Sequence, residues 1–450
     1  METPVVITKR INNDIKNPRE FIIQEEDIPG IRTQNGTADF ILQHRLKSWE
    51  VYQSTPMPST TDEAWRRTDL RGLKAGSLIL RPDYKQSVLP PRNLTKPLLG
   101  KRQAGQIVLI PGQGTIDNIN PSIVKTGVIF TDLKTAQEDH AQFLAQTLGQ
   151  IVKPEDGKFA ALASTMAEDG IVVYIPRGVH LKEPLHSVIW SPGRNLARFT
   201  RLIIWLDEDS ELTYVNELSS PNQLNSQSFH AGIVEIYVGK GAHLTFVELQ
   251  SWGNDVWNFT HERARIDRDG KIDWIFGAMG SHLTKNFSDI DLIGQGATAI
   301  MSGFYFTNKD QHLDHDTQQN HLAPNTTSDL LFKGALKDQS RSVWQGMIYV
   351  APGAQKTDGY QANRNLTLSR SARADSIPGL EILANDVRCT HGATVGKLDE
   401  EELFYLLSRG IPYTEAVRLI VEGFFEPIMQ RIPFEGVRRR FRSIIKRKIR

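Results

Sequence analysis

The only cysteine of the chain, Cys389, is separated from His391 by a single residue. On an extended strand, side chains two positions apart project from the same face, so the thiol and the imidazole would converge. A thiolate beside an imidazole is half of an iron, iron–sulfur or zinc site, and equally a persulfide acceptor with its base. In the alternative interpretation Cys389 is a small buried hydrophobic residue and His391 its hydrogen-bonded neighbour. Two ligands do not complete a metal site, so a cluster bound here would need ligands from a partner subunit.

A second group of candidates contains three histidines, His312, His315 and His321, with Asp314 and Asp316 between them. Imidazole together with carboxylate suits a divalent transition metal. On a strand, however, His312 and His315 point to opposite faces, which argues against one simple tridentate site. We therefore treat the three histidines as weaker metal or partner candidates, and we favour hydrogen-bonded surface positions on the fold.

Motifs for nucleotide hydrolysis and for common hydrolases are missing from the sequence. There is no G-x-x-x-x-G-K-[ST] loop, and the stretch Pro111-Gly112-Gln113-Gly114 lacks the third glycine of a dinucleotide loop. Neither a G-x-S-x-G elbow nor an H-E-x-x-H helix occurs. We predict that the chain is not an enzyme and does not hydrolyse nucleotides by itself.

Composition predicts a cytosolic protein. The 450 residues carry a net charge of +1, with 39% hydrophobic and 23% charged residues, which is ordinary for a globular chain. One cysteine excludes an intramolecular disulfide and the Cys-pair zinc motifs, and fits a reducing compartment. The first twenty residues lack the apolar core of a signal peptide, and no apolar run approaches the ~20 residues of a membrane span.

The C-terminal residues 436–450 contain eight basic and no acidic side chains. Such a tail could bind nucleic acid or an anionic membrane surface. Its apolar residues recur at helical spacing, however, which favours an amphipathic helix that docks on a protein. These residues are Val437, Phe441, Ile444, Ile445 and Ile449. We expect neither a nucleic-acid nor a membrane partner.

The periodicity of the chain changes twice and predicts three domains. Residues 1–168 mix irregular segments with helical patterns at 40–51, 136–151 and 158–167, and with a short helix or turn at 62–73. From residue 169 to 397, short β-branched and aromatic runs alternate with turns, and Gly241, Gly270 and Gly296 recur at the spacing of a β-solenoid rung. Residues 398–450 return to helix, with Asp399 as an N-cap. The fold class is therefore mainly β, with a parallel β-helix core between helical domains.

Residues 380–396, running into 397–411, closely resemble the C-terminal signature of the SufB/SufD family of the SUF iron–sulfur cluster assembly system, and in particular its SufD subunit. Further similar segments are 355–366, 169–179 and the Pro56-Met57-Pro58 stretch, so the resemblance spans about residues 40 to 430. SufB subunits carry several cysteines, and a chain with one resembles SufD. Leu383 and Asn385 depart from the expected aromatic and acidic residues but leave the Cys-x-His spacing intact.

The resemblance implies a right-handed β-helix that forms a heterodimer with a SufB-like subunit through the end of the helix. It also implies a SufC-like ATPase docked on the C-terminal helices, where the candidates are Phe404, Leu407, Arg409, Phe424 and Phe425. By resemblance, His391 matches the family histidine at the SufB interface where the nascent cluster is built, and Cys389 is its neighbour. The chain alone is then expected to hold no tight cofactor, and a transient iron–sulfur cluster or iron would sit at the shared interface.

A parallel β-helix also permits a different function, a polysaccharide-active enzyme that uses acids on the solenoid face. The sequence lacks an obvious pair of catalytic carboxylates and a recognisable secretion signal. This alternative also leaves the helical C-terminus after a Cys-x-His strand without a role. We therefore favour the non-catalytic scaffold.

Overall fold

The computed structural model describes residues 19–31, 39–80, 89–96, 103–111, 114–223, 225–432 and 434–449. Most of the N-terminal stretch that we inspected for a signal peptide lies outside these residues. So do Gly112 and Gln113 of the glycine-containing loop, and Arg450 at the end of the basic tail.

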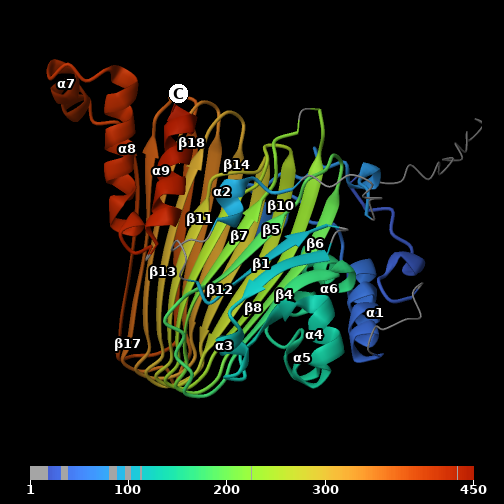
Figure 1. Cartoon of the computed structure of the whole chain (residues 1–450). Helices are drawn as coiled ribbons and strands as arrows, with labels where there is room; N and C mark the ends of the chain where they lie inside the picture. The colour runs from blue at the N-terminus through green and yellow to red at the C-terminus, as the bar shows by residue number, and fades with distance from the viewer. Residues whose placement is uncertain are drawn as a thin grey trace, which may run out of the picture.

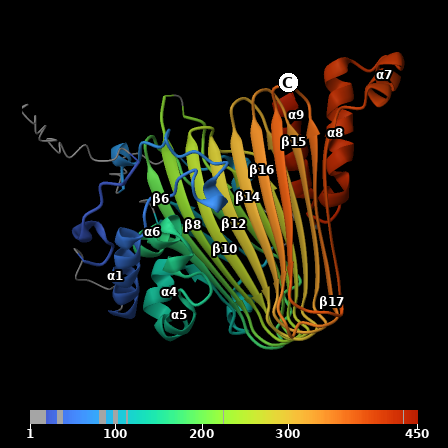
Figure 2. The ribbon, with the colours of Figure 1, turned by 180° about the vertical axis from the view of Figure 1, so that it is seen from behind.

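The core of the molecule is a β-solenoid made of two long sheets (Figures 1 and 2). The first sheet has ten strands: β1 (Gly105–Ile110), β2 (Gly114–Ile119), β5 (Leu185–Trp190), β7 (Glu211–Ser219), β9 (His243–Ser251), β11 (Lys271–Ala278), β13 (Thr298–Thr307), β15 (Thr327–Leu336), β17 (Thr357–Thr367) and β19 (Val387–Lys397). The second has nine: β3 (Ile129–Asp132), β4 (Asp169–Ile175), β6 (Ala197–Leu206), β8 (Ser228–Val238), β10 (Val256–Ile266), β12 (Leu283–Leu292), β14 (His312–His321), β16 (Arg341–Val350) and β18 (Arg373–Ile382).

From β4 to β19 the chain alternates between the sheets, and each strand pairs in parallel with the strand two further along. Within the first sheet, for example, Trp274 lies beside Met301, and Met301 beside Leu330. These three side chains are buried in the hydrophobic core between the sheets. The pairing pattern confirms the predicted β-helix class, because stacked rungs bury their inward residues against their neighbours.

The turns between strands use residues that tolerate a left-handed backbone. Gly241 and Gly296, two of the glycines that marked the rung spacing, have φ of +65° and +77°. At the intervening turn Asp269 takes the left-handed conformation, with φ +55°, and Gly270 does not. Aspartate tolerates this region because its short polar side chain forms local hydrogen bonds.

Most of the N-terminal segment covers the outer face of the second sheet near its start, whereas Leu94 packs on β1 and β5 of the first sheet. It contains α1 (Asp39–Ser54), α2 (Arg92–Thr95), α3 (Pro121–Val124), α4 (Leu133–Asp139), α5 (Ala141–Thr147), α6 (Lys158–Met166) and the 3-10 turns η1 (Glu25–Asp27), η2 (Glu63–Trp65), η3 (Ala75–Ser77) and η4 (Pro154–Asp156). Helix α1 packs with α6, and Lys158 Nζ donates a hydrogen bond of 2.6 Å to the Tyr52 carbonyl. Strand β1 pairs with β5 in the first sheet, and β3 pairs with β4 in the second. Both sheets therefore begin before residue 169.

One of the predicted N-terminal helices differs in the structure. The pattern at 136–151 forms two helices, α4 and α5, because His140 leaves the helical region with φ −132° and ψ 33°. The stretch 62–73, predicted as a short helix or turn, contains the 3-10 turn η2. The helices predicted at 40–51 and 158–167 are confirmed as α1 and α6.

Three helices follow the solenoid: α7 (Glu400–Ser408), α8 (Tyr413–Met429) and α9 (Glu435–Ile449). Asp399 caps α7 as predicted, and its side chain accepts hydrogen bonds from the backbone N–H groups of Glu401 and Glu402. Helices α8 and α9 pack on the outer face of the first sheet, while α7 extends away from it (Figure 1). The apolar stripe of the basic tail thus docks on the chain's own solenoid. Across the described residues, no helix is long and apolar enough to cross a bilayer.

Candidate functional site

The solenoid ends in an open rung formed by β18 and β19. Among the described residues each of these strands is the last of its sheet, since β18 pairs only with β16 and β19 only with β17. Positions that are buried in earlier rungs are exposed here: Val395 aligns with the buried Asn365 and is 53% exposed. The end of the solenoid therefore presents two unpaired strand edges and an uncovered interior.

Cys389 and His391 both lie on β19, aligned with Gly359 and Gln361 of β17. Since Gln361 is buried inside the solenoid, the register places Cys389 and His391 on the interior side of the open rung. The prediction that they share a face is confirmed. His391 is exposed, whereas Cys389 is half-buried beside a small apolar cluster that includes Ile348 and Val350.

The environment of Cys389 does not activate its thiol. Burial, together with the negative charge of Asp358, raises the pKa of Cys389, although the backbone N–H of Gly359 opposes this shift. A raised pKa leaves less thiolate at neutral pH, and the thiolate is the form that binds metal or attacks sulfur. A metal ion or a partner cation would have to supply the missing stabilisation of the thiolate.

The three histidines of β14 occupy both faces of their strand, as predicted. His312 faces outward, and its Nε2 is 2.9 Å from Thr68 Oγ1 of the N-terminal segment. His315 faces inward among Phe276, Tyr305 and Phe332. His315 is fully buried and His312 half-buried, and burial lowers the pKa of each to about 3.

His321 is also buried inside the solenoid, where its two ring nitrogens lie 2.7 Å from Thr326 Oγ1 and 2.8 Å from Ser328 Oγ. Our expectation of surface positions is therefore wrong for His315 and His321, because alternate residues of β14 line the core. In the part of the chain that the structure describes, no group of three His, Cys, Asp or Glu side chains could hold a metal ion. The histidines of β14 do not form a common site.

The structure brings His321 close to Cys389, which the spacing in the sequence did not reveal. A Cβ atom at Gly359 would lie 3.3 Å from Cys389 Sγ and 3.5 Å from His321 Nε2, so both groups border the space that a side chain at this position would fill. Next along β17, Gln361 Oε1 is buried without a hydrogen-bond partner among the described residues. The interior beneath the open rung is thus polar next to both predicted ligands.

Comparison with known proteins assigns the family. The profile described as "SUF system FeS cluster assembly, SufBD core domain" matches residues 189–424, and "SufBD protein N-terminal region" matches residues 31–186. The chain belongs to the SufBD family. The first profile covers most of the solenoid together with α7 and most of α8, so membership extends through the open rung and the site on β19.

Individual SufBD relatives are similar along most of the chain. The iron–sulfur cluster assembly protein SufB of Bacillus subtilis is 29% identical over 429 residues, which is 92% of this chain and 90% of the relative. A SufBD family protein of Staphylococcus epidermidis is 32% identical over 321 residues, or 71% of this chain and 68% of the relative. Membership assigns this chain to iron–sulfur cluster assembly in the SUF system.

The predicted docking residues of this SufBD protein fall into two groups. On α7, Phe404 and Leu407 are 72% and 40% exposed, and the guanidinium of Arg409 lies 5.2 Å from the centre of the Tyr405 ring. On α8, Phe424 is half-buried under Lys333.

Phe425, also on α8, is fully buried against Phe304 of the first sheet. It offers no surface to a partner, contrary to our expectation, because α8 turns this side of its apolar stripe toward the solenoid. Of the predicted docking residues, the exposed apolar side chains of α7 are accessible to a partner.

Proposed function

We propose that this chain is a non-catalytic, SufD-type scaffold subunit that pairs end to end with a SufB-like solenoid in a SufBCD-type complex. The observation that carries the proposal is the open rung of β18 and β19. Exposed strand edges invite pairing with another chain, and a partner solenoid would continue both sheets. The single cysteine of the chain supports the SufD type, because the resemblance implies that SufB subunits carry several cysteines.

In this complex Cys389 and His391 would face the partner across the new interface. They supply a soft and an imidazole ligand, and the partner supplies the rest of the coordination shell. The cluster or iron is then a transient product at the shared interface, not a resident cofactor of either subunit. A bound metal would favour the thiolate of Cys389 and so offset the burial that raises its pKa.

A SufC-like ATPase would dock on α7 and the neighbouring surface of α8. Phe404, Tyr405, Leu407 and Leu419 are large apolar side chains exposed in this region. A cluster of exposed apolar residues is typical of a protein-binding surface. The ATPase would supply the nucleotide chemistry for which this sequence has no phosphate-binding loop.

Substitution of Val395 tests the end-to-end pairing. Val395→Glu places a charge on the open rung, where it would be buried without a partner in the heterodimer, so we expect capture of a tagged SufB-like subunit to fall at least tenfold. Val124→Glu, at a site on α3 that is 60% exposed, is the matched control and should leave capture unchanged. Anaerobic pull-down with analysis of iron and acid-labile sulfide gives both readouts. Equal capture of the two variants would refute pairing through this rung.

A further inference from the structure

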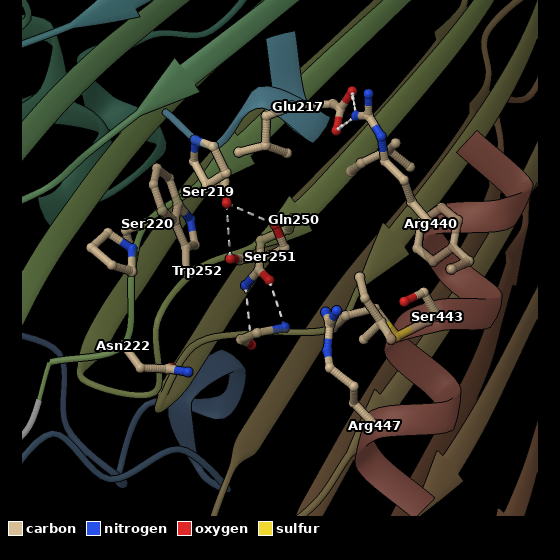
Figure 3. Close-up of a pocket in the computed structure, with 18 of the residues that line it drawn as sticks. Glu217, Ser219, Ser220, Asn222, Gln250, Ser251, Trp252, Arg440, Ser443 and Arg447 are labelled. Atoms are coloured by element: carbon tan, nitrogen blue, oxygen red, sulfur yellow. Dashed lines mark hydrogen bonds and ion pairs between the residues drawn. The ribbon is translucent and has the colours of Figure 1, made fainter. Parts of the chain in front are cut away.

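A second, separate site lies between the basic helix α9 and the outer face of the first sheet. A cavity of about 780 Å³ opens there on one side to solvent (Figure 3). One wall consists of the ends of β7 and β9, the loops that follow β7, β9, β11 and β13, and the short helix α2, and the other wall is α9. This volume falls in the range of small-molecule sites, roughly 300 to 1,000 Å³. Helix α9 is fixed over it by Val437, Phe441 and Ile445, which are buried against the sheet.

The charge of the cavity lining is strongly positive. The lining contains one carboxylate, that of Glu217, and five cationic side chains: Lys309, Arg439, Arg440, Arg447 and Lys448. The carboxylate of Glu217 already has partners within the protein, since it pairs with Arg440 and lies 2.8 Å from His186 Nε2. Although burial opposes ionisation, His186 and Arg440 lower the pKa of Glu217, so this carboxylate stays charged and satisfied.

The remaining cations lack such neutralisation. No acidic group among the described residues pairs with the side chains of Lys309, Arg439 or Arg447. In Figure 3, Arg447 extends from α9 toward the strand wall that carries Gln250. Guanidinium groups match phosphate oxygens in geometry and charge, so this wall suits a phosphate more than an uncharged ligand.

Lys448 adds an amine whose surroundings disfavour its charged form. Its Nζ donates hydrogen bonds of 2.6 Å to the Phe306 carbonyl and to Gln311 Oε1, both neutral groups. Burial, and then the charge of Lys309, lowers the pKa of Lys448 to about 7. An anion in the cavity would restore the charged form of this amine, which couples ligand binding to the protonation of Lys448.

Neutral groups of the lining complete an amphipathic site. On the strand side, Asn222 Oδ1 accepts a hydrogen bond from the Asn254 backbone, which leaves the Asn222 amide donor for a ligand. Apolar side chains cover the rest of the wall, namely Leu249, Trp252, Met279, Phe441 and Ile444. Such a lining orients a ligand with an apolar body and one anionic end.

We propose that this cavity binds a small organic phosphate, with the phosphate on Arg447 and Lys309 and the apolar body on the side chains between α9 and the sheet. The site is distinct from the open rung, and it does not depend on the role proposed there. Binding would also clamp α9 onto the solenoid, because the ligand would contact both walls. The basic tail would then be a ligand-binding element of the chain.

Calorimetric titration of the full chain with 1-naphthyl phosphate tests the proposal. Arg447→Gln should weaken binding roughly tenfold or more, the loss expected for one charge-assisted contact. Lys446→Gln is the matched control: it removes the same charge from α9, but Lys446 does not line the cavity, so affinity should stay within about twofold. Lys309→Gln should also weaken binding. Because Lys309 lies outside α9, this loss could not be explained by a loosened helix.

Four results would overturn the proposal. Equal losses in the Arg447 and Lys446 variants would show that only the diffuse charge of α9 attracts anions, and duplex DNA binding reduced equally by both would point to a nucleic-acid surface. Equal affinity for 1-naphthol and 1-naphthyl phosphate would show that the phosphate makes no contact. No heat from the wild-type chain at millimolar 1-naphthyl phosphate would exclude the site.

Discussion

Cys389 and His321 meet at Gly359, with Sγ 3.3 Å and Nε2 3.5 Å from the point where a Cβ atom of that glycine would stand. One comes from the last strand of the first sheet and the other from β14 of the second. The interior below the candidate cluster site therefore contains a neutral imidazole. This ring has two hydroxyl partners, and within the described part of the chain no acid near it stabilises a positive charge.

His321 should make the protein sensitive to acid. Burial lowers its pKa to about 4 in the fold, against about 6.5 in the unfolded chain. Between these values the unfolded chain binds the extra proton, so stability present above pH 6.5 is lost as the pH falls toward 4, by up to about 1.4 kcal/mol per pH unit. Urea unfolding of wild type and His321→Gln from pH 7 to 5 should show a shallower loss in the variant. The exposed His180→Gln should match wild type, and identical slopes in all three would contradict the assignment.

His391→Ala should impair cluster assembly without unfolding the chain. The side chain is exposed, so its removal should change the free energy of unfolding by no more than about 0.5 kcal/mol. Maturation in cells, measured as the activity of an iron–sulfur client enzyme, should fall severely. Cys389→Ser should give a smaller defect if the thiol only supports the histidine. Full maturation by His391→Ala would remove this residue from the site.

Substitution of Glu235 should destabilise the junction between the N-terminal segment and the solenoid. Glu235 pairs with the buried Arg201 and accepts backbone hydrogen bonds from Gly149, Ile151 and Val152, at 3.1, 2.9 and 3.2 Å. Glu235→Gln leaves the Arg201 charge uncompensated, which should cost about 3 kcal/mol of unfolding free energy in urea. Glu63→Gln breaks an exposed pair with Arg66 and should cost less than about 1 kcal/mol. Similar losses for both would contradict the buried role.

Phe404→Ala should weaken ATPase docking. The ring is 72% exposed on α7, so its truncation removes little from the fold, whereas an aromatic anchor at an interface is typically worth about 2 kcal/mol or more. Surface plasmon resonance with a SufC-like subunit should show roughly a thirtyfold loss of affinity. Ile116→Ala, at a site on β2 that is 52% exposed, is the control. Unchanged affinity of the Phe404 variant would move the docking surface away from α7.

Local patterns determined much of the fold in advance. The change from helical spacing to β-branched runs near residue 169, the Asp399 cap and the stripe of α9 all reappear in the structure, because each depends on neighbours within a few residues. The pattern at 136–151 failed at His140, where one non-helical residue divides an otherwise periodic stretch. Such a break has no strong sequence signal.

The sequence by itself determined the solenoid class and the shared face of Cys389 and His391, since these follow from periodicity and short spacing, and the resemblance of its segments indicated the family. Only the tertiary structure decided which positions are covered. It buried His315 and His321 in the core, buried Phe425 under α8, and left the rung of β19 open. It also placed His321 beside Cys389 and folded the basic tail over a cavity. The physical reason is that burial and long-range proximity depend on how rungs stack and helices dock, and spacing along the chain does not record either.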